Sequence, residues 1–272
     1  MAEDAIEESK PDEFAALFGP FVRLLNYTGE IFILLGQLIR EMFKPGGIGF
    51  RELIEQMAAL GVSSIPIALL TNFASGAVLA LYFAPFLNRY GVGSFTGGVV
   101  ALSISRELAP VLTGVVVAAR AGSAIAAEIG TMRVTEQIDA LRALAVSPIR
   151  YLVVPRVLAA VIMLPVVCVM ADTAGIGGGY IIATHLDVPA SAFFDSIRTL
   201  LVPTDFLLGI VKTLFFGLIL AIVGCHQGLR TRGGATEVGR ATTNAVVISI
   251  VLIYISDYFL ADVLFASAPS NI

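Results

Sequence analysis

The sequence predicts an all-α integral membrane protein with an N-terminal interfacial helix and five transmembrane helices. Hydrophobic residues make up 57% of the 272-residue chain and charged residues only 14%, with a mean hydropathy of +0.89. Soluble domains usually carry about 25% charged residues. Residues 56–88 contain no charged side chain, and residues 157–186 contain only Asp172. Each stretch is longer than the roughly 20 apolar residues that cross a bilayer.

The apolar stretches divide the chain into five predicted spans. We expect them at about residues 58–85, 97–127, 153–182, 206–227 and 242–265, within a membrane domain covering residues 51–272. A polar segment between the second and third spans is too hydrophilic to enter a bilayer. We expect this segment to form a cytoplasmic helix at about residues 132–146.

Two regions precede the first predicted span. Residues 1–13 hold six acidic side chains against one lysine, so we expect a disordered acidic tail. Residues 14–50 are apolar but interrupted by polar side chains such as Arg23, Glu30 and Arg40. A helix lying in the membrane interface fits these interruptions better than a sixth crossing, which remains the alternative.

The orientation follows from the distribution of lysine and arginine, which are enriched on the cytoplasmic side of membrane proteins. One side of the five predicted spans receives twelve of these residues, and the other receives only Arg89 and Arg198. We therefore expect the N-terminus and the segment between the second and third spans to be cytoplasmic. Five crossings then place the C-terminus on the opposite, periplasmic side.

The second span contains charged residues in an unusual pattern, "RELAPVLTGVVVAARAGSAIAAEIG" from Arg106 to Gly130. At 100° per residue, Arg106, Pro110, Arg120 and Glu128 fall on one helical stripe, which must face protein or water. Pro110 lacks a backbone donor and should bend the helix near Arg106. Small residues recur every fourth position and predict close packing of a neighbouring helix: Gly114, Ala118, Gly122 and Ala126.

Charged residues of four spans are expected at one depth, in the half of the bilayer away from the cytoplasm. They are Arg106 and Glu107, Asp172, Lys212, and Asp257. Each would cost about 2.5 to 3.5 kcal/mol if buried in the bilayer without a partner, so mutual pairing or a shared cavity is expected. Two interpretations remain open at this point: a purely structural ion-pair cluster, or a polar site or gate in a substrate path.

The chain carries no motif for nucleotide hydrolysis or metal binding. It has no GxxxxGK[ST] phosphate loop, and neither His185 nor His226 belongs to an HExxH pattern. Both histidines are interpreted as ordinary residues at the membrane edges. We therefore expect no catalytic residues, metal or cofactor in this chain, so any nucleotide chemistry must come from another chain.

A longer run extends this pattern, "RELAPVLTGVVVAARAGSAIAAEIGTMRVTEQIDALRALAVSPIRYLVVPRVLA" from Arg106 to Ala159. It resembles the signature region of MlaE/YrbE-type permeases of ABC lipid transporters, which include the TGD permease of the chloroplast inner envelope. The resemblance in organisation covers roughly residues 14–266. It implies a permease that moves phospholipid or related lipid between the inner membrane and a ring of MCE-domain proteins.

The resemblance also implies partners and residue roles. It implies a homodimer, an MlaF-like ABC ATPase that binds ATP and Mg, an MlaD-like MCE-domain protein and, in many bacteria, an MlaB-like STAS-domain protein. The helix at 132–146 would be the coupling helix that contacts the ATPase, through Arg133, Glu136, Ile138, Leu141 and Arg142. Arg106, Glu107, Lys212 and Asp257 match charged positions near the family's lipid cavity. A bacterial inner membrane is the expected location, with the plastid inner envelope as the alternative.

Two other classes of function are alternatives to such a permease. An ion-coupled secondary transporter could use Lys212 and Asp257 as an ion relay, although five spans show no inverted repeat. An intramembrane hydrolase would need a paired aspartate or a Ser/His arrangement at common depth, and the sequence offers neither. No nucleic-acid partner is expected.

Overall fold

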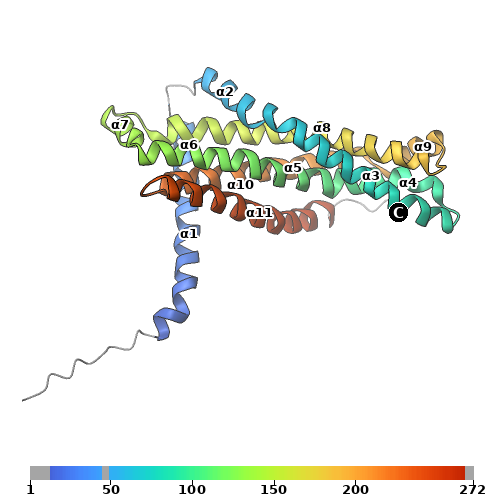
Figure 1. Ribbon diagram of the computed structural model, residues 1–272, viewed down its shortest axis with the longest axis horizontal. Helices are drawn as coiled ribbons and strands as arrows, with labels where there is room; N and C mark the ends of the chain where they lie inside the picture. The colour runs from blue at the N-terminus through green and yellow to red at the C-terminus, as the bar shows by residue number, and fades with distance from the viewer. Residues whose placement is uncertain (1–12, 45–48, 267–272) are drawn as a thin grey trace, which may run out of the picture.

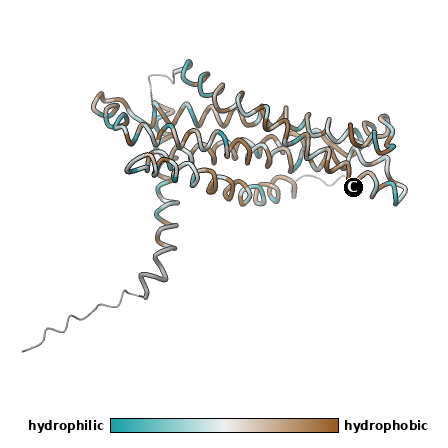
Figure 2. Tube along the Cα trace, viewed as in Figure 1, coloured by the Kyte–Doolittle hydropathy of each residue, from teal (hydrophilic) through white to brown (hydrophobic). Residues whose placement is uncertain are grey.

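The computed structural model describes residues 13–44 and 49–266, and these residues form helices without a β-strand. Five helical segments are long and apolar enough to cross a membrane. They lie side by side along the long axis of the molecule (Figure 1). Hydrophobic residues dominate the middle of these segments, and hydrophilic residues gather toward their ends (Figure 2). The predicted all-α fold with five spans is confirmed. The acidic residues 1–12 lie outside the described part of the chain.

The five membrane segments are longer than the predicted spans, because their polar ends continue the helices. The first contains α2 (Phe50–Leu60) and α3 (Ile65–Arg89), and the second contains α4 (Thr96–Ser103), α5 (Ala109–Val117) and α6 (Ser123–Val134). The third contains α8 (Val154–His185). The fourth is α10 (Pro203–Arg230), and the fifth is α11 (Ala235–Ala266).

Short helices mark the two ends of this bundle. At one end, α7 (Gln137–Ala143) connects the second and third segments. At the opposite end, α9 (Ala190–Leu200) connects the third and fourth. We call these the α7 end and the α9 end. Several basic residues that the sequence predicts to be cytoplasmic lie toward the α7 end, among them Arg133, Arg156 and Arg230.

Helix α1 (Glu13–Met42) runs crosswise to the bundle at its α7 end (Figure 1). It packs onto the bundle through Leu34 and Leu38, which are buried, while Phe32 and Ile33 are 71% and 62% exposed. A helix in this direction, with apolar side chains left uncovered, has the geometry of an interfacial helix. It is not among the five segments that could span a membrane.

The second membrane segment is interrupted by two π-helical turns, at Ile104–Leu108 and Ala118–Gly122. Such turns insert a residue into the helical ladder and are frequent at functional sites. The first one ends two residues before Pro110, which has no N–H and cannot donate to the Arg106 carbonyl four residues earlier. The irregularity expected from Pro110 is therefore a wide turn that contains Arg106 and Glu107 themselves.

Helices α3 and α8 approach each other closely enough for backbone to touch backbone. A methyl group at Gly76 would collide with the carbonyl of Gly175, and one at Gly178 would collide with the carbonyl of Phe73. Such close approach between spanning helices requires residues without side chains. Gly177, next in the same helix, faces away from this contact, since a methyl group there would meet no atom within 4 Å.

These adjacent glycines give a matched test of the close contact. Gly178→Ala should lower the free energy of unfolding by about 1 to 3 kcal/mol, because the added methyl group forces α3 and α8 apart. Gly177→Ala should leave stability unchanged or raise it slightly, since alanine is the better helix former. Thermal unfolding of both variants in mild detergent measures the difference. Equal stability of the two variants would contradict the observed packing.

Candidate functional site

A cluster of charged side chains lies inside the bundle toward its α9 end, with Lys212 at its centre. The Lys212 side chain is 0% exposed. Its Nζ lies 2.8 Å from Glu107 Oε2 and 3.0 Å from Asp257 Oδ1. Lys212 thus joins the first π-turn, α10 and α11. The shared depth of these residues in the sequence predicted this meeting of three spans.

Lys212 also donates a hydrogen bond to the backbone carbonyl of Arg106, over 3.2 Å. This is the carbonyl whose ordinary helical donor is removed by Pro110. The ammonium group carries three donors, and three acceptors surround it: two carboxylates and one carbonyl. The proline four residues after Arg106 therefore leaves this carbonyl without its helical donor, and the carbonyl accepts from Lys212 instead.

The Arg106 side chain pairs with a residue that was not predicted from the sequence. Its Nη2 lies 2.7 Å from Asp205 Oδ1, and the Asp205 side chain is only 4% exposed. Asp205 sits in the first turn of α10, two residues after Pro203, and its Oδ2 accepts a bond from the Val202 N–H over 3.4 Å. Proline followed by an acidic residue is a signal for a helix start. Asp205 also lies seven residues before Lys212, on the same helical face.

Phe265, near the end of α11, covers the cluster from one side. Its ring centroid lies 4.9 Å from Arg106 Cζ and 5.1 Å from Lys212 Nζ. A cation near the face of an aromatic ring is attracted by the ring quadrupole. Helix α11 therefore contributes both a carboxylate and an aromatic ring to the site.

Asp172 lies apart from these ion pairs, although it was predicted at the same depth. It is 3% exposed, and both its carboxylate oxygens accept from Ser105 Oγ at 3.0 Å. Among the described residues it forms no ion pair. Depth alone places a residue along the membrane normal but not around the helix axis, which is why Asp172 and Arg106 were predicted together.

Arg120 and Glu128 of the second segment have partners near the α7 end. Glu128 pairs with Arg156 of α8 over 2.9 Å. Arg120, in the second π-turn, donates to the Ala59 carbonyl at 3.2 Å and to Ser64 Oγ at 3.3 Å. Both charged groups therefore connect helices within the bundle.

The small residues at every fourth position lie buried against α10. A methyl group at Gly114 would contact the Phe216 ring, and Gly224 of α10 approaches the Gly122 carbonyl. Ala118 and Ala126 are 0% exposed. This packing brings α10, with Lys212, close to the second membrane segment.

Helix α7 is shorter than the helix predicted at 132–146. Helix α6 continues to Val134, and the chain then turns at Glu136, whose φ of 62° is left-handed. Ala145, with φ of 58°, follows the other end of α7. Local positive φ values of this kind in residues other than glycine are not visible in hydrophobic periodicity.

The residues predicted to contact an ATPase lie on α7 and just before it, and they divide into a buried group and an open, charged group. Ile138 is fully buried and Leu141 packs against the core. Arg133 and Arg142 each lie 2.9 Å from an oxygen of Asp139, and Glu136 is exposed. Leu144, just beyond α7, is 74% exposed. The buried face holds α7 rigidly, while its charged face remains open.

We call Arg106, Glu107, Asp205, Lys212 and Asp257 the Lys212 cluster. Its ion pairs lead us to expect a distinctive pattern of stability among variants. Lys212→Met leaves two carboxylates without their cation and should lower the free energy of unfolding by about 3 kcal/mol. Combining it with Glu107→Gln and Asp257→Asn removes all three charges and should restore most of this loss, since an uncharged cluster leaves no unpaired ion. Thermal unfolding in mild detergent measures both variants. A triple variant as unstable as Lys212→Met would contradict the ion-pair account.

Comparison of the sequence with known proteins shows which family the chain belongs to. The sequence model of the family described as Permease MlaE matches residues 53–263. A Rickettsia bellii protein named "Probable ABC transporter permease protein" is 42% identical over 90% of this chain and 94% of its own length. A Synechocystis protein with the same description is 46% identical over 86% of this chain and 89% of its own length.

A plant relative is also similar. The Arabidopsis thaliana protein named "TRIGALACTOSYLDIACYLGLYCEROL 1, chloroplastic" is 38% identical over 88% of this chain and 69% of its own length. The family match includes most of each of the five membrane segments, the charged residues of the Lys212 cluster and α7. The chain therefore belongs to the MlaE family of ABC transporter permeases.

Proposed function

We propose that this chain is the membrane subunit of an ATP-driven transporter that moves phospholipid or related lipid between the inner membrane and a ring of MCE-domain proteins. The observation that carries the proposal is the Lys212 cluster, which gathers five charged side chains from three membrane segments. Charged residues within membrane segments are costly and mark substrate paths more often than plain packing. The name of the Arabidopsis relative contains that of a glycolipid, which supports a lipid substrate.

In this proposal the Lys212 cluster lines or gates the lipid path. Arg106 retains 36% exposure and Glu107 44%, so both side chains can be reached from outside the packed bundle. A lipid headgroup could exchange partners with these ions. Two copies of the chain would enclose the path between them, with the N-terminus and the α7 end cytoplasmic and the C-terminus periplasmic.

Energy would come from a separate ABC ATPase that binds ATP and Mg and contacts α7. To drive a conformational change, the closed ATPase must bind the two conformations of the permease with different affinities. Helix α7 suits this role because its buried face connects it to the bundle and its charged face is open. Arg133, Glu136 and Arg142 would be the contacting residues.

Charge reversal on the open face of α7 tests this coupling. Arg142→Glu or Glu136→Arg should reduce ATP-dependent lipid transfer by about tenfold, because the two proteins lose complementary contacts. ATP hydrolysis should continue in the same reconstituted complex. Arg51→Glu is the matched control, since Arg51 is 88% exposed at the same end of the bundle and lies on α2. Coupled transport at the normal rate in both α7 variants would overturn the proposed contact.

The partners are tested by affinity purification of the tagged chain in mild detergent. We expect a second copy of the chain, an ABC ATPase and an MCE-domain protein to be recovered with it, with a STAS-domain protein where the organism has one. Recovery of the chain alone, together with transport driven by an ion gradient in liposomes without ATPase, would instead favour an ion-coupled secondary transporter. Localisation of the tagged chain would separate a bacterial inner membrane from a plastid envelope.

A further inference from the structure

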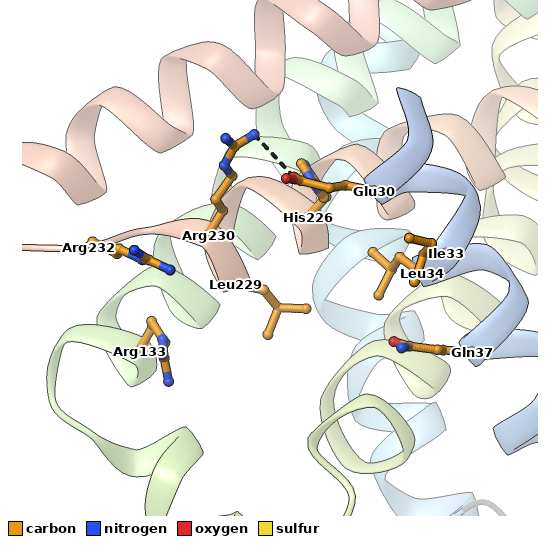
Figure 3. A pocket seen from close by; sticks show the side chains of 9 residues that line it. All are labelled: Glu30, Ile33, Leu34, Gln37, Arg133, His226, Leu229, Arg230 and Arg232. Atoms are coloured by element: carbon orange, nitrogen blue, oxygen red, sulfur yellow. Dashed lines mark hydrogen bonds and ion pairs between the residues drawn. The ribbon is translucent and has the colours of Figure 1, made fainter. Parts of the chain in front are cut away.

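A second polar region lies far from the Lys212 cluster, at the α7 end of the bundle. A cleft of about 580 Å³ opens between the crosswise helix α1, the end of α6 and the end of α10. Figure 3 shows the side chains that line it. They are Glu30, Ile33, Leu34, Gln37, Arg133, His226, Leu229, Arg230 and Arg232.

Positive charge exceeds negative charge around this cleft. Glu30 Oε2 lies 3.1 Å from Arg230 Nη1 and 2.9 Å from His226 Nε2, so one carboxylate serves both groups. Arg133 is paired with Asp139. Arg232 is exposed and has no ion pair or hydrogen bond from its side chain among the described residues. One guanidinium charge is therefore left in excess even with His226 neutral.

The cleft also has apolar lining on the side of α1. Ile33, which is 62% exposed, and Leu34 lie there between Glu30 and Gln37, and Leu229 of α10 lines the cleft as well (Figure 3). Phe32, the residue before Ile33, is 71% exposed. A cleft with guanidinium groups on one side and uncovered apolar side chains on the other is complementary to an anionic amphiphile rather than to a small ion.

The cleft also lies at the right level for a lipid headgroup. Arg230 is the last residue of the fourth membrane segment, and Arg133 is the second-last residue of the second. Arg230 lies three residues and Arg133 six residues beyond the predicted ends of their spans, which is about 5 to 9 Å along each helix and within reach of the headgroup region. Basic pockets between spanning helices at this level are suited to anionic headgroups.

We propose that this cleft binds the phosphate of an anionic phospholipid, with Arg232 and Arg133 facing the phosphate and the acyl chains lying along α1. The site is separate from the Lys212 cluster, which lies toward the α9 end. It rests on the assignment of the five membrane segments and not on the direction of transport. Helix α1 then has a specific lipid contact beside its general apolar one.

Lipid titration of the purified full-length chain tests the site. Native mass spectrometry in mild detergent measures binding of phosphatidylglycerol and of zwitterionic phosphatidylcholine. The wild-type chain should bind phosphatidylglycerol more tightly, by at least about fivefold. Arg232→Gln should raise the dissociation constant for phosphatidylglycerol about fivefold, because each guanidinium near the surface contributes about that factor. Adding Arg133→Gln should raise it further.

Arg240→Gln is the matched control. Arg240 is an exposed arginine in the nearby start of α11, is paired with Glu237, and does not line the cleft. Its removal should leave the preference for phosphatidylglycerol unchanged. Arg232 is exposed, so the single variant should fold normally, and its thermal unfolding in detergent checks this.

Three results would overturn the proposal. Equal binding of the two lipids would remove the headgroup preference, and an equal loss in Arg240→Gln would indicate only a general effect of charge. Displacement of phosphatidylglycerol by millimolar inorganic phosphate would identify a site for a free anion instead of a lipid. The assay contains no ATPase and no nucleotide, so any of these results leaves the proposed transport function standing.

Discussion

The buried ammonium group of Lys212 is the interaction on which the arrangement of the membrane segments depends. It donates hydrogen bonds to Glu107 and Asp257, which belong to two other segments, and to the backbone carbonyl of Arg106. That carbonyl is open to it because Pro110 cannot donate to it and a π-turn widens the helix there. A regular helix without proline would have used the same oxygen for its own backbone bond. The third hydrogen bond of Lys212 thus depends on the π-turn and on Pro110.

The fold could be predicted because five segments are long, apolar and separated by polar sequence. Polar interruptions predicted that residues 14–50 lie in the membrane interface, and the crosswise course of α1 is consistent with that prediction. The helices extend beyond the predicted spans, since hydropathy measures transfer into lipid while helical hydrogen bonds continue beyond the apolar core. The length of α7 was overestimated, because the left-handed backbone at Glu136 that starts it leaves no trace in hydrophobic periodicity.

Four of the charged residues could be brought together from depth alone: Arg106, Glu107, Lys212 and Asp257. Depth alone also grouped Asp172 with them, but its carboxylate accepts from Ser105 and forms no ion pair with the cluster. Depth gives the position of a residue along the membrane normal and not its direction around the helix axis. Asp205 was missed since it lies one residue before the predicted fourth span, 206–227. The Pro203 helix start and the seven-residue spacing to Lys212 could have found it. The functional roles of these residues remain predictions that the transport experiments test.

Helix α11 combines little burial with a carboxylate that pairs with Lys212. Only 11% of its most apolar window is buried within the bundle, against 67% for the third segment, yet it supplies Asp257 and Phe265 to the cluster. Apolar packing therefore offers weak resistance to sideways displacement of this helix, whereas separation of Asp257 from Lys212 is opposed electrostatically. A ligand that competes for either ion would lower the work of opening a lateral entrance beside α11. The ion pair at one depth of the bilayer would then control whether α11 separates from the bundle along its length.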